Sequence, residues 1–129
     1  MPPERRIIID ATFPWRIAEE LQRRGYRDAT SPFQLGDASI KDPPLLKMIH
    51  DKLEPAVLVT FDHKMPVQHA SLLVQYTTTL VVVDKNGEPP ELTREEYWRE
   101  VIHRHAHRFA YQEPDTGWKY RRRGRTNIY

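Results

Sequence analysis

Three aspartates, Asp10, Asp42 and Asp62, stand at positions from which their carboxylates could bind a metal ion. Asp10 and Asp62 each follow an apolar run of strand length, and Asp42 precedes a proline where a helix is expected to begin. Carboxylate oxygens are hard ligands that suit Mg²⁺ and Mn²⁺. An ion held beside a phosphate orients a water and stabilises developing charge. These three residues are therefore candidate metal ligands and candidate catalytic residues for phosphodiester cleavage.

Simpler roles remain open for two of these aspartates and for a fourth. Asp42 could be only a helix N-cap, and Asp62 only a turn residue after a strand. Asp84 ends another apolar run but enters Lys-Asn-Gly, which is a turn-forming sequence. Asp10 precedes Ala11 and has no comparable local role, so it is the strongest of the candidates.

The six histidines are less specific than the aspartates. His103 and His107 have the i, i+4 spacing that could bind a transition metal, although a solvated or structural helix face explains this spacing better. His105 falls on an apolar face and is expected to be a hydrogen-bonded core residue. His63 and His69 follow Asp62 and could contact a phosphate or a water.

The elements that would position these residues alternate along the chain. Buried strands are expected at 5–10, 56–60 and 78–84, and a short strand at 26–30. Helices are expected from Thr12 to Gly25, from Asp42 as N-cap to Pro55, over 66–76, and from a Thr93–Glu96 capping box onward. These expected elements are those of an α/β protein, a three-layer sandwich with a central, mainly parallel sheet. Ligands of such sheets bind at the carboxyl ends of the strands, where the aspartates would converge.

Composition limits the classes of protein that fit. A chain of 129 residues with 39% hydrophobic and 29% charged residues suits one globular domain. The absence of cysteine excludes disulfides and thiolate metal sites, and favours a cytoplasmic location. No stretch has the length of a membrane span or the character of a signal peptide, so no membrane association is expected.

The C-terminal residues are strongly basic. Lys119, Arg121, Arg122, Arg123 and Arg125 are interleaved with Trp118 and Tyr120, a composition that suits RNA phosphates and stacked bases. The helical pattern ends near Tyr111. We therefore expect a domain over residues 1–111 and a basic C-terminal tail over 112–129, although a charge run can also be merely solvated.

Three segments resemble the PIN-like nuclease superfamily, in its small branch that includes VapC-type toxins. They begin with Ile-Ile-Ile-Asp10, Lys-Asp42-Pro-Pro and Val-Leu-Val-Thr-Phe-Asp62, and the match covers about residues 5–84. The resemblance implies a PIN-like fold and an Mg²⁺- or Mn²⁺-dependent endoribonuclease with Asp10, Asp42 and Asp62 as metal ligands. It also implies RNA as substrate, a cognate antitoxin protein, and a possible homodimer.

Ala11 and Lys64 stand where the branch commonly has further acidic residues. They motivate an alternative, a catalytically weakened PIN-like module that binds RNA or a protein partner. A third hypothesis is a phosphohydrolase with an aspartate nucleophile. Such an enzyme requires a second aspartate two residues after the first, and this chain has Thr12 at that position.

Overall fold

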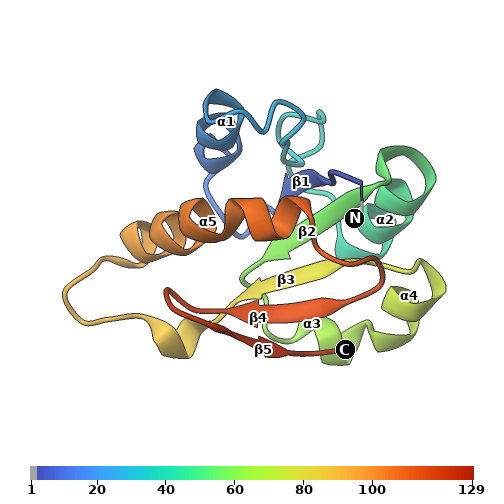
Figure 1. Cartoon of the computed structure of the whole chain (residues 1–129). Helices are drawn as coiled ribbons and strands as arrows, with labels where there is room; N and C mark the ends of the chain where they lie inside the picture. Colours follow the sequence, from blue (N-terminus) through green and yellow to red (C-terminus); the bar gives the residue numbers. More distant parts are fainter. Residues whose placement is uncertain (1–2) are drawn as a thin grey trace.

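The computed structural model describes residues 3–129 (Figure 1). The strands are β1 (Arg6–Ile9), β2 (Ala56–Thr60), β3 (Leu80–Val83), β4 (Gly117–Tyr120) and β5 (Arg125–Asn127). The α-helices are α1 (Arg16–Arg23), α2 (Asp42–Met48), α3 (Met65–Gln68), α4 (Ala70–Gln75) and α5 (Arg94–Ala110). The segment η1 (Ile49–Leu53) continues α2 as a π-helical turn, and η2 (Lys85–Gly87) is a 3₁₀ turn.

The strands form a five-stranded sheet in the order β1-β2-β3-β4-β5. Strands β1 to β4 are parallel, and β5 pairs antiparallel with β4. This confirms the predicted α/β class and the mainly parallel sheet. Because Ile9 pairs with Val59, the residues that follow β1 and β2 leave the sheet side by side at its carboxyl edge.

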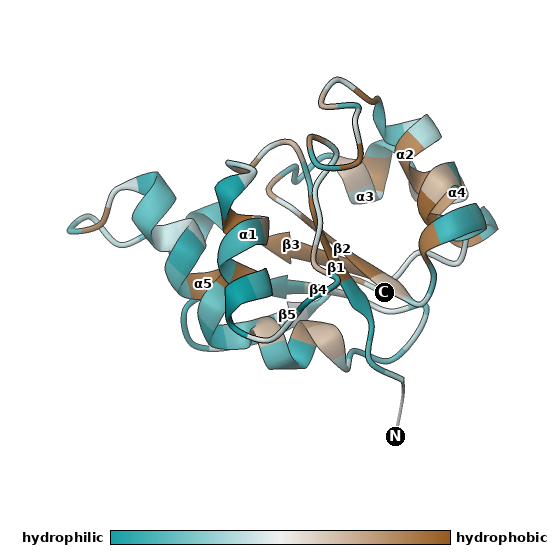
Figure 2. Ribbon diagram, turned by 90° about the horizontal axis from the view of Figure 1, so that it is seen from above, coloured by the Kyte–Doolittle hydropathy of each residue, from teal (hydrophilic) through white to brown (hydrophobic). Residues whose placement is uncertain are grey.

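Apolar cores lie on both faces of the sheet. Alternate strand residues such as Ile7, Ile9 and Val59 pack with α1 and α5, and the intervening ones, such as Ile8 and Leu58, pack with α2 and α4. Figure 2 shows hydrophobic residues along β1, β2 and β3, and both hydrophobic and hydrophilic residues along the helices around them. Strands buried on both faces require near-continuous apolar runs, which is why these strands are recognisable in the sequence.

Two helix signals act as predicted. Gly25 adopts φ +104° after α1, a conformation that favours glycine. Thr93 and Glu96 form the expected capping box at the start of α5, through bonds of 3.1 Å from Glu96 N to Thr93 Oγ1 and 2.9 Å from Thr93 N to Glu96 Oε1.

Other predicted elements differ from the structure. Thr12 does not cap α1, which begins at Arg16, and its hydroxyl bonds to Asp10 instead. Lys41, not Asp42, occupies the N-cap position of α2, so the cap prediction for Asp42 is wrong by one residue. The expected helix over 66–76 is divided at His69 into α3 and α4. The predicted strand at 26–30 is reduced to a single bridge between Thr30 and Ile8.

The C-terminal residues are part of the sheet. Strand β4 lies beside β3 over the whole length of both, and Tyr120 is fully buried. The division into a domain ending at 111 and a separate tail over 112–129 is therefore corrected, because residues 117–120 and 125–127 complete the sheet. Figure 1 shows this β4–β5 hairpin lying beside β3.

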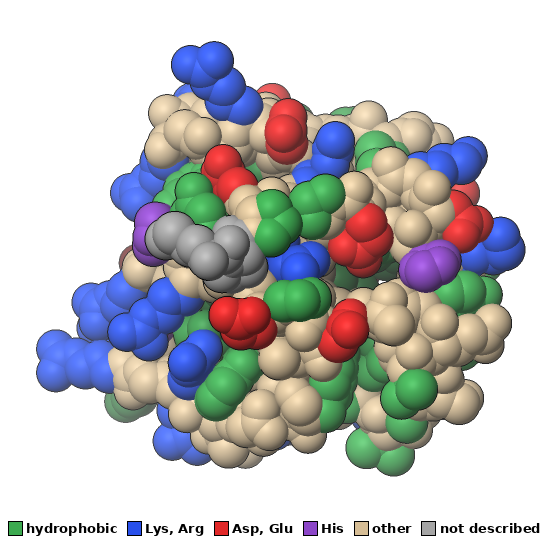
Figure 3. All heavy atoms as spheres, turned by 45° about the vertical axis from the view of Figure 1, so that its right-hand side comes forward, with side chains coloured by type: hydrophobic (Ala, Val, Ile, Leu, Met, Phe, Trp, Pro, Cys, Tyr) green, Lys and Arg blue, Asp and Glu red, His purple; other side chains and the backbone are tan. Residues whose placement is uncertain are grey.

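Charge is mixed on one face of the molecule. The face in Figure 3, turned toward the N-terminus and the α4 side, carries basic, acidic and apolar side chains interspersed. Within residues 3–129, no helix combines the length and the apolar character that crossing a bilayer requires.

Candidate functional site

Asp10 lies at the carboxyl end of β1 and is almost fully buried, with 6% of its surface exposed. The hydroxyls of Thr60 and Thr12 both donate to its Oδ2 atom, over 2.7 and 3.2 Å. Its Oδ1 atom accepts no hydrogen bond from the residues the structure describes. The carboxylate therefore has one oxygen held in place, and its other oxygen is available to a further ligand.

Asp62 is joined to Asp10 through Thr60. The Asp62 N–H donates to Thr60 Oγ1 over 3.0 Å, and the Thr60 hydroxyl in turn donates to Asp10 Oδ2. A second link runs from the Phe61 N–H to Thr12 Oγ1 over 3.2 Å. The Asp62 carboxylate itself accepts from the Lys64 N–H over 2.9 Å, which also gives it the turn role considered above.

Asp42 approaches the same edge from the first turn of α2. Burial raises the pKa of its carboxyl, and the negative charges of Asp10 and Asp62 raise this pKa further. His69, whose Nε2 lies 3.6 Å from Asp42 Oδ2, acts in the opposite direction. The fold therefore brings Asp10 and Asp62 within electrostatic range of Asp42.

The donor chemistry suits a hard cation, but not through a complete set of protein ligands. Within residues 3–129, no three His, Asp or Glu side chains lie close enough together to bind one metal ion. Magnesium normally keeps several of its waters and needs only one or two protein carboxylates. The residues present therefore fit a largely hydrated Mg²⁺ or Mn²⁺ ion, and not a site in which all three carboxylates bind the ion directly.

Asp84, which ends the next strand, has a structural role. Its carboxylate accepts from the Asn86 N–H and from Arg121 Nε, each over 2.9 Å. Burial acts to raise the pKa of Asp84, but these two donors outweigh it and hold the pKa below its usual value. This agrees with the turn interpretation of its sequence.

Most of the basic residues predicted to bind RNA are engaged within the protein. Arg121 pairs with Asp84, Arg122 Nε pairs with Glu100 Oε1 over 2.7 Å, and Arg125 lies 3.8 Å above the Trp118 ring. Lys119 and Arg123 form no ion pair with the described residues.

Arg121 and Arg122 thus stabilise the β4–β5 hairpin. Lys119 and Arg123 are the members of the set left for phosphate contacts.

The histidines divide between structure and site. His103 Nε2 lies 2.8 Å from Glu20, and His105 Nε2 donates to the carbonyls of Arg121 and Arg122, which confirms the core role predicted for His105. His63 Nε2 accepts from the Lys85 N–H over 3.2 Å. Burial lowers the pKa of His63, and the nearby lysines at 119 and 85 lower it further. Of the six, His69 is the one in contact with a candidate carboxylate.

Sequence reasoning missed the two threonines that hold Asp10. Thr60 ends β2, where its hydroxyl looks like an ordinary β-branched strand residue, and Thr12 looks like a helix cap. The spacing Asp-x-Thr at 10–12 was the available signal, because a hydroxyl two residues after a strand-end carboxylate can bond back to it.

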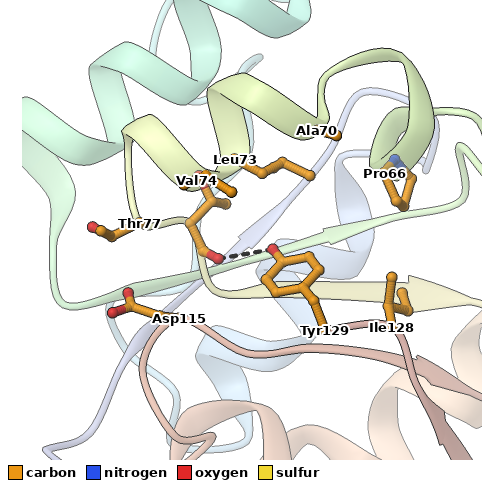
Figure 4. A pocket seen from close by; sticks show the side chains of 9 residues that line it. Pro66, Ala70, Leu73, Val74, Thr77, Asp115, Ile128 and Tyr129 are labelled. Carbon is orange, nitrogen blue, oxygen red and sulfur yellow. Dashed lines mark hydrogen bonds between the residues drawn. The ribbon is translucent and has the colours of Figure 1, made fainter.

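A large cavity of about 480 Å³ lies away from these carboxylates (Figure 4). It is bounded by α4 and the C-terminal residues, and its lining is mainly apolar, including Leu73, Val74 and Ile128. The Tyr129 side chain lines this cavity, and its hydroxyl donates to the Thr78 carbonyl over 2.8 Å. This cavity holds none of the candidate catalytic residues.

Comparisons of this chain with protein-family models, with curated proteins and with solved structures find no match.

Proposed function

We propose that the protein is an endoribonuclease that uses Mg²⁺ or Mn²⁺ and has a PIN-like arrangement of helices on both faces of its sheet. The observation that carries this proposal is the buried Asp10 carboxylate. It is oriented by two threonine hydroxyls at the carboxyl edge of a parallel sheet, next to Asp62 and within electrostatic range of Asp42. Ligands bind at this edge in open α/β sheets.

In this proposal Asp10 and Asp42 would hold the ion, with Asp62 acting through a bound water. Such an ion supplies Lewis acidity and lowers the pKa of a bound water. Thr60 and Thr12 restrict the Asp10 carboxylate through its Oδ2 atom, which would leave Oδ1 to bind the ion. Lys119 and Arg123 contribute phosphate contacts, which add affinity without selecting a sequence.

The test is cleavage of an end-labelled single-stranded RNA with EDTA, Mg²⁺ or Mn²⁺. We expect cleavage only with a divalent ion. We expect Asp10→Asn to reduce its rate about 100-fold or more, because metal-supplied charge stabilisation is worth several kcal/mol. Asp84→Asn is the matched control, since it makes the same chemical change at the end of another parallel strand, β3.

Two results contradict the proposal. One is an Asp10→Asn protein, purified in the same way, that still cleaves RNA at the wild-type rate. The other is a folded Asp84→Asn protein that loses as much activity as Asp10→Asn, because Asp84 is paired with Arg121 and has no place in the proposed chemistry.

A second candidate function is RNA binding without catalysis. It is favoured by the absence, within residues 3–129, of a group of three side chains able to share a metal ion. Ala11 and Lys64 add to this, because they replace acidic residues common in the resembling branch. A titration with Mn²⁺ separates the two functions: neither thermal stabilisation nor cleavage is expected of a binding module.

A further inference from the structure

Trp15 and Phe33 form a stacked aromatic pair outside the core. Their ring centroids are 5.0 Å apart and their planes differ by 20°. Trp15 precedes the first residue of α1, and Phe33 lies in the loop between Thr30 and α2. Phe33 is 54% exposed, so a face or edge of this pair is open to a ligand.

The pair lies at the same edge of the sheet as Asp10. Thr30 bridges to Ile8 in the parallel sense, with Ile9 N donating to Thr30 O over 2.8 Å. The chain from Thr30 to Phe33 therefore runs alongside the end of β1 and leaves the sheet at its carboxyl edge. Trp15 reaches that edge from β1 itself, through the turn that follows Asp10. The aromatic pair thus flanks Asp10 on the side opposite to β2.

Contacts other than those of Phe33 also hold the loop in place. The loop is fastened to α1 by Gln22, whose Nε2 donates to the Ala29 carbonyl over 2.7 Å and to Gln34 Oε1 over 3.3 Å. Pro32 is buried, and its carbonyl accepts from the Asp37 N–H over 2.9 Å. With these anchors present, the loop does not depend on Phe33 alone, and the part of the ring that does not stack on Trp15 is open to solvent.

The chemistry around the pair suits an unpaired nucleobase. Aromatic side chains stack on base faces, and those faces are accessible only when a base is unpaired. The Arg16 guanidinium lies 5.8 Å from the Trp15 ring centroid, is exposed, and has no carboxylate partner among the described residues. It is placed to contact a phosphate next to a stacked base.

We propose that Trp15 and Phe33 are a stacking platform for one unpaired base of an RNA ligand, with Arg16 contacting the adjoining phosphate. This deepens the proposed function, because the platform would set a flanking nucleotide beside Asp10. It selects single-stranded over double-stranded RNA without reading sequence.

The test is the affinity of a fluorescently labelled single-stranded RNA, measured by anisotropy in EDTA so that no cleavage occurs. Phe33→Ala is expected to weaken binding about 5- to 100-fold, the range that loss of one base–aromatic stack produces. Phe33→Tyr keeps an aromatic face and is expected to bind within about twofold of wild type. Val74→Ala is the matched control, because Val74 is also highly exposed, at 78%, but lies on α4. Circular dichroism of each variant confirms that it is folded.

Three outcomes would overturn the platform: wild-type protein that binds no single-stranded RNA, Phe33→Ala that binds as tightly as wild type, or equal dependence on Phe33 for the same RNA in a duplex. Failure of the proposed function gives a different result. Wild-type protein that binds single strands through Phe33 but does not cleave them with Mg²⁺ or Mn²⁺ supports the platform and contradicts the nuclease. Metal-dependent cleavage and binding that are both unchanged in Phe33→Ala support the nuclease and contradict the platform.

Discussion

Replacing Thr60 by valine tests whether its hydroxyl organises the candidate site. Valine keeps the β-branched shape that suits strand β2. The change removes the 2.7 Å bond to Asp10 Oδ2 and the 3.0 Å bond accepted from the Asp62 N–H. Thr60 is fully buried, so water does not readily replace either bond.

The expected loss follows from these two bonds. A hydrogen bond to a charged group contributes about 1.5–3 kcal/mol and a neutral one about 1 kcal/mol, so Thr60→Val is expected to lower the free energy of unfolding by about 2–4 kcal/mol. For a chain of this length, each kcal/mol corresponds to roughly 4 °C in Tm. Urea unfolding gives the free-energy difference, provided that the m-value is unchanged. Thr126→Val on the exposed strand β5 is the control, with an expected change within about 0.5 kcal/mol.

A double-mutant cycle separates the Asp10 bond from general effects of the valine. In an Asp10→Ala background the Thr60 hydroxyl has lost its acceptor, so Thr60→Val should cost at least about 1 kcal/mol less than in wild type. An equal cost in both backgrounds would refute the reasoning, because it would mean that the hydroxyl does not stabilise the carboxylate. If the nuclease proposal holds, Thr60→Val should also slow metal-dependent cleavage.

Three further predictions concern single side chains. The pKa of the Asp42 carboxyl is raised by burial and by Asp10 and Asp62, so its charge opposes folding above that pKa, and this opposition is relieved as pH falls through it. Asp42→Asn should therefore raise Tm at pH 7 in EDTA and gain less stability than wild type on acidification. It should also lose metal-dependent cleavage. A lower Tm at pH 7, in a variant with native circular dichroism, would contradict this. Thr93→Ala breaks the capping box of α5 and should cost about 1 kcal/mol by urea unfolding. Burial lowers the pKa of His105 from its usual value of 6.5. Below pH 6.5 the unfolded chain therefore binds a proton at this histidine that the folded protein does not bind. As pH falls from 6.5, the wild-type protein should lose stability more steeply than His105→Gln.

The parts of the fold that could be predicted are those set by local pattern. Ile7, Ile8 and Ile9 form a short run of β-branched residues, which favours a strand covered on both sides, and all three are buried. The position of Asp10 at the end of that strand follows directly. The convergence of Asp62 with Asp10 follows as well, because adjacent parallel strands end at one edge.

The remaining parts depend on contacts between residues distant in sequence. The sequence of strand β4 predicts a basic tail, because Lys119 and the arginines after it are residues typical of a solvent-exposed segment. In the structure Arg121 and Arg122 are instead paired with Asp84 and Glu100. No local pattern shows that these partners will lie beside the strand. The two-residue spacing of Trp118 and Tyr120 was a local sign of a strand, but the surrounding charge obscured it.

The distribution of ion pairs bears on why the site carboxylates are where they are. This chain supplies cations to several of its other buried or half-buried acids: Asp84 has Arg121, and Glu20 has Arg99 and His103.

Asp10, Asp42 and Asp62 have no Lys or Arg partner among the described residues, although the chain contains 20 such residues. Instead, neutral hydroxyls orient Asp10, and its charge adds to the unfavourable field at Asp42. A purely structural role does not require this arrangement, because a single arginine would stabilise it. A site that must bind a cation from solution does require it, since a resident side-chain cation would occupy the place of the ion.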